Sequence, residues 1–240
     1  MKKHIPNIIT LMNLFCGCVA INFAFHERLD WAAYMVFIAA VLDFLDGFAA
    51  RLLHVHSEMG KQLDSLADVV TFGVVPGVVL SQLMILTLDT TQPDLGDNSI
   101  PYIILIFAPY LISLFSALRL AKFNLDTRQS DSFIGVPTPA NTILIVALPL
   151  ILQNDKLHLS HIILNIYFLL GLTLLMSFLL VAELPLIALK FKTFSWKDNS
   201  IRYILILSSG VLFSIFLFTA IPMIIILYVI LSLINNLNKK

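Results

Sequence analysis

Long apolar runs separated by short polar stretches organise this chain of 240 residues. A helix needs about 17–25 mostly apolar residues to cross the hydrocarbon core of a bilayer. Runs near this length predict eight helices, at 7–25, 31–53, 61–88, 100–121, 138–153, 160–182, 201–217 and 219–236. The last two belong to one apolar run, which we expect the segment from Thr219 to Pro222 to divide. The alternative is a single long helix followed by a surface segment.

Composition supports the same interpretation. The chain is 59% hydrophobic and 12% charged, which is typical of an all-α polytopic membrane protein rather than of a soluble domain. The formal net charge is zero, so we expect no nucleic-acid partner. Lys2 and Lys3 precede the first apolar run as in a signal peptide, but no small-x-small site precedes a soluble segment. We therefore expect an uncleaved first helix.

Four aspartates stand among apolar residues in the segment 43–68, namely Asp43, Asp46, Asp64 and Asp68. Each would cost roughly 2.5–3.5 kcal/mol at the centre of a bilayer. The members of each pair are three or four residues apart, so each pair shares one face of a helix. The break at 54–60 lets the two helices run antiparallel and brings the pairs together. Ligands that offer only oxygen favour Mg²⁺ or Mn²⁺ over zinc.

The spacing of these acids with four neighbouring residues forms a longer motif, Asp43-x2-Asp46-Gly47-x2-Ala50-Arg51-x8-Gly60-x3-Asp64-x3-Asp68. This motif resembles the signature of the CDP-alcohol phosphotransferase family. The resemblance implies a membrane-embedded catalytic domain with six core helices, which we expect at 1–200. About two C-terminal transmembrane helices would follow at 201–240.

The resemblance also implies roles for particular residues. The four aspartates would bind two divalent cations, with Asp43 and Asp64 bridging both, Asp46 completing one site and Asp68 the other. Asp68 would also be the general base that takes the proton of the acceptor hydroxyl. Contacts to the CDP-lipid are expected from five residues: Asn7, Thr10, Gly47, Arg51 and Ser57.

Other segments bear on the acceptor alcohol. The stretches 6–14, 116–124, 135–140 and 191–199 resemble the phosphatidylserine synthase branch of this family. The resemblance implies CDP-diacylglycerol and L-serine as substrates, CMP as the leaving product, and a homodimer. Arg119 and Asn124 are expected to hold the serine carboxylate, although a basic membrane anchor is an equally good interpretation of Arg119. His54 and His56 are interpreted as solvated loop residues rather than metal ligands.

Two other functions remain open at this level. A sister enzyme could use glycerol 3-phosphate or an inositol phosphate, but a phosphorylated acceptor needs extra cations near the metals. Beyond Arg51, the segment between the acid pairs offers only Lys61. A cation-coupled transporter also carries intramembrane acids. It would be expected to spread them over several helices and to have repeat symmetry, whereas here the four acids lie close together.

The distribution of lysine and arginine predicts the orientation. With the N-terminus inside the cell, thirteen of the fifteen basic residues fall in inner loops and ends, and only Arg28 and Lys156 lie outside. Because positive charge accumulates on the cytoplasmic side, this asymmetry indicates an even number of helices. It also places the 54–60 turn, and with it the active site, at the cytosolic face of the bacterial inner membrane.

Cysteine labelling tests this orientation. In a background with Cys16 and Cys18 replaced by alanine, we expect a cysteine introduced at 54–58 to react with an impermeant maleimide only after the membrane is opened. A cysteine introduced at 90–98 should react in intact cells. Reversed labelling of the two sets would contradict the orientation.

Overall fold

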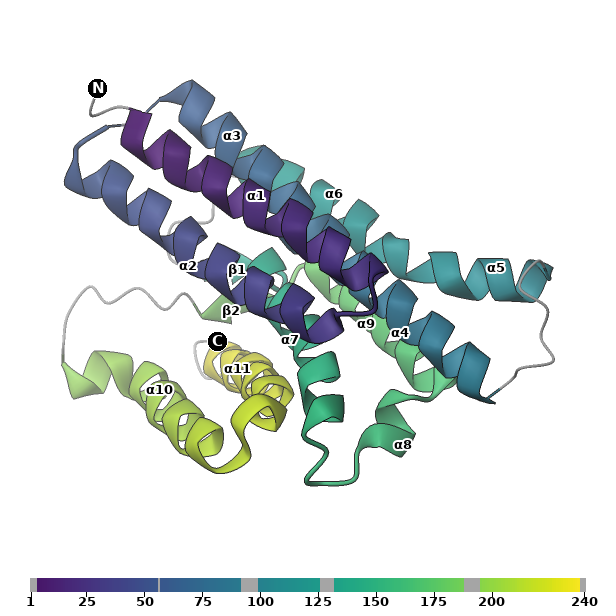
Figure 1. The fold of residues 1–240 in the computed structure, drawn as a ribbon. Helices are drawn as coiled ribbons and strands as arrows, with labels where there is room; N and C mark the ends of the chain where they lie inside the picture. The colour runs from purple at the N-terminus through teal and green to yellow at the C-terminus, as the bar shows by residue number, and fades with distance from the viewer. Residues whose placement is uncertain (1–3, 56, 92–98, 126–131, 188–194, 238–240) are drawn as a thin grey trace.

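The computed structural model describes residues 4–55, 57–91, 99–125, 132–187 and 195–237 (Figure 1). Its first half contains α1 (Ile5–Phe25), α2 (Leu29–Leu52), α3 (Glu58–Asp68), the π-helix η2 (Val69–Val74), α4 (Val75–Thr91), α5 (Ile100–Phe107), the 3₁₀ turn η3 (Ala108–Tyr110) and α6 (Leu111–Leu125). Its second half contains β1 (Ser132–Ile134), α7 (Thr138–Gln153), α8 (Ser160–Ile163), α9 (Ile166–Val181), β2 (Pro185–Ile187), α10 (Trp196–Phe216), the 3₁₀ turn η4 (Leu217–Thr219) and α11 (Ala220–Leu237).

Five helical stretches of the described chain are long and apolar enough to span a membrane: Ile5–Phe25, Leu29–Leu52, Glu58–Asp89, Ile100–Leu125 and Asn199–Asn236. Two shorter apolar helices, α7 and α9, complete a six-helix core beside the C-terminal pair. Large apolar side chains such as Phe44 and Leu114 are about two-thirds exposed, as expected for surfaces that face lipid. The predicted all-α polytopic membrane protein is therefore confirmed.

The C-terminal apolar run reverses direction at η4, so that α10 and α11 lie side by side (Figure 1). Leu217 at this turn has a φ of 49°, which ends α10. The predicted division into two helices is confirmed, although the break starts at Leu217 rather than at Thr219. The helix predicted from 201 begins earlier, at Trp196, whose ring stacks on Tyr203 with centroids 5.3 Å apart.

Two other predicted boundaries are wrong for reasons of local capping. The third helix starts at Glu58, before the expected 61, because the Ser57 hydroxyl accepts a hydrogen bond from the Gly60 amide at 3.0 Å. The helix predicted at 160–182 is interrupted between α8 and α9. There the Asn165 side chain accepts hydrogen bonds from the amides of Tyr167 and Phe168 and starts a new helix. Parts of the 90–98 loop and of the 191–199 stretch lie outside the described residues.

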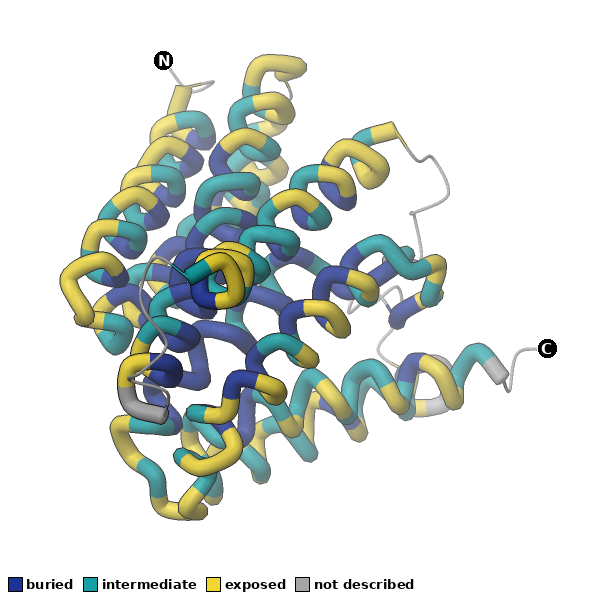
Figure 2. The backbone as a smooth tube through the Cα atoms, turned by 90° about the vertical axis from the view of Figure 1, so that its right-hand side faces the viewer, coloured by how far each residue is buried: buried dark blue, intermediate teal, exposed yellow. Residues whose placement is uncertain are grey.

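α3, η2 and α4 form one continuous rod, and its part from Phe72 to Leu88 belongs to the hydrophobic core. Buried residues concentrate in the interior of the helix bundle (Figure 2). A β-carbon on Gly17 of α1 would lie 2.5 Å from Thr71 Oγ1, and one on Gly77 would lie 2.7 Å from Ser113 Oγ of α6. Glycine is therefore required for α1 and α6 to approach the rod this closely. From α7, the Thr142 hydroxyl donates to the carbonyl of Phe72 at 2.8 Å.

A two-stranded antiparallel sheet, which the sequence pattern did not predict, joins the segments before α7 and after α9. β1 pairs with β2 so that Phe133 lies opposite Leu186. Gly135 follows β1 with a φ of 76°, and its amide donates to the carbonyl of Leu184 at 2.9 Å. A β-carbon here would lie 2.6 Å from the carbonyl oxygen of Leu180, so only glycine fits this turn.

Candidate active site

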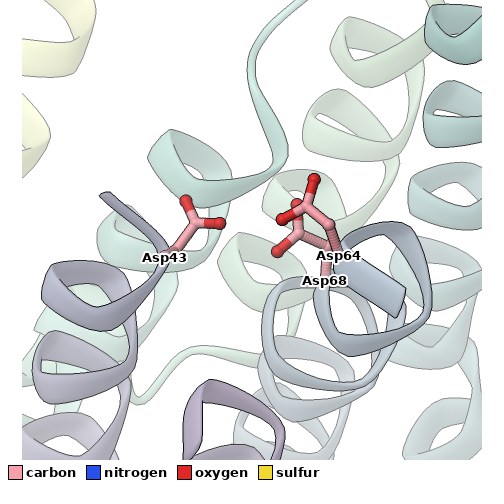
Figure 3. Close-up of side chains that lie close together, drawn as sticks. All are labelled: Asp43, Asp64 and Asp68. Atoms are coloured by element: carbon pink, nitrogen blue, oxygen red, sulfur yellow. The ribbon is translucent and has the colours of Figure 1, made fainter. Parts of the chain in front are cut away.

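Three of the four predicted metal ligands meet where α2 runs past α3. Asp43 projects from α2, and Asp64 and Asp68 project from successive turns of α3, so that the three carboxylates face one another (Figure 3). One oxygen from each lies within 4.8 Å of the other two. α1 packs on both α2 and α3 and thus holds them where carboxylates that repel one another come together.

Asp46 lies one turn beyond Asp43 and outside this group of three. Its Oδ2 accepts a hydrogen bond of 2.7 Å from the Thr10 hydroxyl of α1, and both side chains are buried. Its charge still acts on Asp43 and Asp64. Thr10, predicted to contact the CDP-lipid, therefore also orients one of the four acids.

The donor set fits a divalent cation. Two unit charges about 4 Å apart repel by roughly 4 kcal/mol at the effective dielectric constant of a protein surface. Three carboxylates within 4.8 Å therefore need a compensating positive charge to persist together. Carboxylate oxygens are the ligands preferred by Mg²⁺ and Mn²⁺, so the Asp43, Asp64 and Asp68 cluster can hold such an ion.

A polar cavity of about 500 Å³ adjoins the acids, between α1, the end of α2 and the start of α3. This volume is in the range of small-molecule sites, roughly 300–1,000 Å³. Asp46 and Asp64 line it, together with four of the five residues predicted to contact the CDP-lipid: Asn7, Thr10, Gly47 and Ser57. The fifth, Arg51, is exposed, and its Nη1 lies 3.6 Å from where a Gly47 β-carbon would stand.

The start of α3 brings groups of both charges to this cavity. Ser57 caps the helix, and Glu58, Gly60 and Lys61 of its first turn also line the cavity. The amides of a helix N-terminus attract negative charge. The Lys61 ammonium, which donates to the carbonyl of Asn124 at 3.4 Å, adds to this attraction, and the Glu58 carboxylate opposes it. A β-carbon on Gly60 would lie 3.1 Å from Asn7 Oδ1, so glycine keeps α1 close to the helix start.

The two predicted acceptor-binding residues have different surroundings. Arg119 of α6 is 7% exposed, and its Nε has no hydrogen-bond partner within the described chain. Its guanidinium lies 5.5 Å from the ring centroid of Phe123. Asn124 instead donates to the Ser65 hydroxyl at 2.8 Å, which links α6 to α3.

Sequence reasoning did not assign a role to two buried polar residues in the first turns of α7. Thr138 and Asn141 are fully buried, and the Thr138 hydroxyl and both polar atoms of the Asn141 amide lack hydrogen-bond partners among the described residues. One turn further along α7, the Thr142 hydroxyl donates to the carbonyl of Phe72, which follows Asp68 by four residues. The sequence alone could have drawn attention to Thr138 and Asn141, because a polar side chain without a hydrogen-bond partner in an apolar helix costs free energy.

The histidines of the α2–α3 turn contribute nothing to the acid cluster in the part of the chain described. His54 is exposed, with a φ of 53°, and is absent from the group of three carboxylates. His56 lies outside the described residues.

Comparison with known proteins agrees with this geometry. A family model described as CDP-alcohol phosphatidyltransferase matches residues 3–180. A CDP-diacylglycerol–serine O-phosphatidyltransferase of Bacillus subtilis (strain 168) is 34% identical over 168 residues, which are 68% of this chain and 88% of that protein.

Two further relatives are covered over a smaller part of their length. A protein of the same name from Helicobacter pylori (strain J99) is 37% identical over 155 residues, which are 64% of this chain and 59% of the relative. The archaetidylserine synthase of Methanothermobacter thermautotrophicus is 29% identical over 144 residues, or 59% of this chain and 55% of the relative. Since the family model covers well over half of the sequence, this chain belongs to the CDP-alcohol phosphatidyltransferase family.

Proposed function

We propose that this protein transfers the phosphatidyl group of CDP-diacylglycerol to L-serine and releases CMP. The reaction would take place at the cytosolic face of the cell membrane, in a catalytic domain of residues 1–200 followed by the C-terminal helices at 201–240. The functional unit would be a homodimer. The single observation that carries the proposal is the meeting of Asp43, Asp64 and Asp68 beside a polar cavity. The names of the relatives supply the substrates.

The cavity suits the nucleotide and the pyrophosphate of CDP-diacylglycerol. Asn7 and Ser57 offer polar atoms at its wall, and the start of α3 with Lys61 offers positive potential for phosphate oxygens. Gly47 leaves space that a side chain would fill, and Arg51 stands beside it with a forked donor. The acyl chains would extend from this opening into the bilayer.

The four aspartates would hold two divalent cations, Mg²⁺ or Mn²⁺. Bound there, such ions would neutralise the pyrophosphate and stabilise charge on the attacking and leaving oxygens. Asp46 is kept in position by Thr10, whereas Oδ1 of Asp68 has no hydrogen-bond partner within the described chain. This buried oxygen without a partner supports the assignment of Asp68 as the proton acceptor.

The proposed step balances as one substitution at phosphorus. The hydroxyl oxygen of serine forms a bond to the phosphorus that carries diacylglycerol, and the bond from that phosphorus to the oxygen of CMP breaks. The serine hydroxyl proton passes to the Asp68 carboxylate, and the electron pair of the broken bond leaves with CMP. A positioned base of this kind typically contributes about 10²–10⁴-fold to the rate.

Buried polar groups on α6 and α7 favour an amino acid as the acceptor. Arg119 is a buried cation on α6 whose Nε has no partner within the described chain, and it could pair with a carboxylate. Asn141 and Thr138 offer the unpaired donors and acceptors that an ammonium group and a carboxylate require. Asn124, whose amide donates to the Ser65 hydroxyl, would hold α6 in place against α3. Two relatives named as serine transferases and one named as archaetidylserine synthase point to the same acceptor.

The direct test is an acceptor panel. Purified protein is incubated with CDP-diacylglycerol, Mn²⁺ or Mg²⁺, and L-serine, glycerol 3-phosphate, inositol or inositol phosphate, and CMP release is measured. We expect release with serine, and none after the metal is removed by a chelator. Release with a phosphorylated alcohol but not with serine would identify a sister enzyme instead.

Removing single ligands tests the two-cation site. We expect Asp43→Asn, Asp46→Asn and Asp64→Asn each to abolish CMP release, because each loses a ligand charge. None should lower the midpoint of thermal unfolding in metal-free detergent, since each also relieves repulsion within the cluster. Asp30→Asn, which alters an acid paired with Arg28 elsewhere on α2, is the matched control. Near-normal turnover of any ligand variant at saturating metal would rule out this arrangement.

Asp68→Asn separates proton transfer from metal binding. Asparagine keeps the size and one coordinating oxygen but does not accept the proton, so turnover should fall by about 10²–10⁴-fold. Affinity for CDP-diacylglycerol should be largely retained. Both quantities are measured on the same preparation, by lipid-nucleotide binding and by serine-dependent CMP release. If affinity falls in step with turnover, Asp68 acts chiefly as a ligand and another group is the base.

A further inference from the structure

Three polar side chains form a stripe along α11, four residues apart, in a helix that is otherwise mainly apolar. All three bind the backbone of β2. Tyr228 donates to the carbonyl of Ile187 at 3.0 Å, the Ser232 hydroxyl accepts from the Ile187 amide at 3.2 Å, and Asn236 donates to the carbonyl of Pro185. Their spacing places them on one face of α11.

These bonds complete the hydrogen bonding of a sheet edge. Successive residues of a strand direct their amide and carbonyl groups to opposite edges. The carbonyl of Pro185 and both the amide and the carbonyl of Ile187 point toward α11, on the edge of β2 that β1 does not occupy. Within a membrane protein an open sheet edge is costly, because no water satisfies it. The α11 stripe therefore supplies the partners that a third strand would otherwise provide.

The sheet transmits this contact to the start of α7. β2 pairs with β1, and the chain leaves β1 through Gly135 and Val136. Their amides donate to the carbonyls of Leu184 and Leu179 at 2.9 and 3.0 Å. Two residues later α7 begins at Thr138, which together with Asn141 carries unpaired polar atoms. An unbroken series of hydrogen bonds and strand pairing thus runs from α11 to the first turns of α7, and Thr142 bonds this helix to Phe72, four residues after Asp68.

Direct packing supports the same connection. Tyr228 lines an apolar groove of about 430 Å³ together with Pro137 and Ala140 at the start of α7. One side chain of α11 is therefore associated with both β2 and the start of α7.

We propose that α11 is a brace for the acceptor site, and that Tyr228, Ser232 and Asn236 are its positioning residues. They act through β2 and β1 on the first turns of α7, and so set the affinity for the acceptor rather than for the CDP-lipid. All three lie beyond residue 180, where the family match ends. The inference rests on the proposed function for the identity of the acceptor, but not for the brace itself.

The central experiment compares Ser232→Ala with the full-length parent protein. Loss of one buried hydrogen bond should raise the KM for serine about two- to tenfold. The KM for CDP-diacylglycerol should stay within about twofold of the parent value. Ser232→Thr keeps the hydroxyl and should restore the KM for serine. Ser208→Ala removes a hydroxyl that bonds only within α10 and should change neither constant.

Hydrogen–deuterium exchange provides a readout that does not depend on activity. Ser232→Ala should exchange faster than Ser208→Ala at the amides of 135–142, without a general increase along α3 and α4. If Ser232→Ala does not fold, Tyr228→Phe tests the same brace by removing only the bond to Ile187. Equal changes in both KM values, or unchanged exchange at 135–142, would overturn the proposal.

Failure of the brace and failure of the proposed function have different outcomes. If the parent protein releases no CMP with serine, the assigned acceptor is wrong. The KM comparison is then made with the alcohol that the parent uses, and the exchange experiment remains unaffected. If the parent uses serine and the variants leave its KM unchanged, only the brace is wrong.

Discussion

Mutual repulsion among closely spaced carboxylates is the constraint on which this structure depends. Asp43 and Asp64, which are half-buried, and Asp68, which is buried, lie within 4.8 Å of one another. The rod of α3, η2 and α4 is contacted closely by α1 at Gly17 and by α6 at Gly77, and α7 bonds to it through Thr142. Close packing at small residues thus holds together charges that electrostatics would separate. The stability of the acid cluster is a property of the whole core.

The site has two sides with different construction. Toward α1 and the end of α2 it is an open polar cavity next to a helix N-terminus, suited to a nucleotide and its phosphates. Toward α6 and α7 it consists of buried polar side chains with unpaired atoms, suited to a small, fully desolvated group. Asp46 and Asp64 line the first side. Under the proposed function, each substrate would be recognised by elements that the other does not touch.

The parts that could be predicted from the sequence are those determined by local periodicity. The spacing of Asp43, Asp64 and Asp68 fixed their helical faces, and the length of apolar runs located the membrane helices within a few residues. Contacts between distant segments could not be foreseen. The pairing of β1 with β2 rests on three residues from each strand, too few to give a pattern. The interruption before α9 depends on the cap that the Asn165 side chain provides for this helix. The apolar run in which Asn165 lies gives no sign of that cap.

The π-helical segment at Val69–Val74 has a consequence for how this chain can vary. Backbone hydrogen bonds in a π-helix join residues five apart rather than four apart. Here the π-helix directly follows Asp68. Removing one residue from it would rotate α4 by about 100° relative to the acids. Gly77 would then turn away from Ser113, and a bulkier side chain would take its place against α6. A change in the length of this segment therefore displaces half of the rod. Descendants of this sequence should therefore tolerate insertions and deletions in the connecting loops but keep the number of residues between Asp68 and Gly77 fixed.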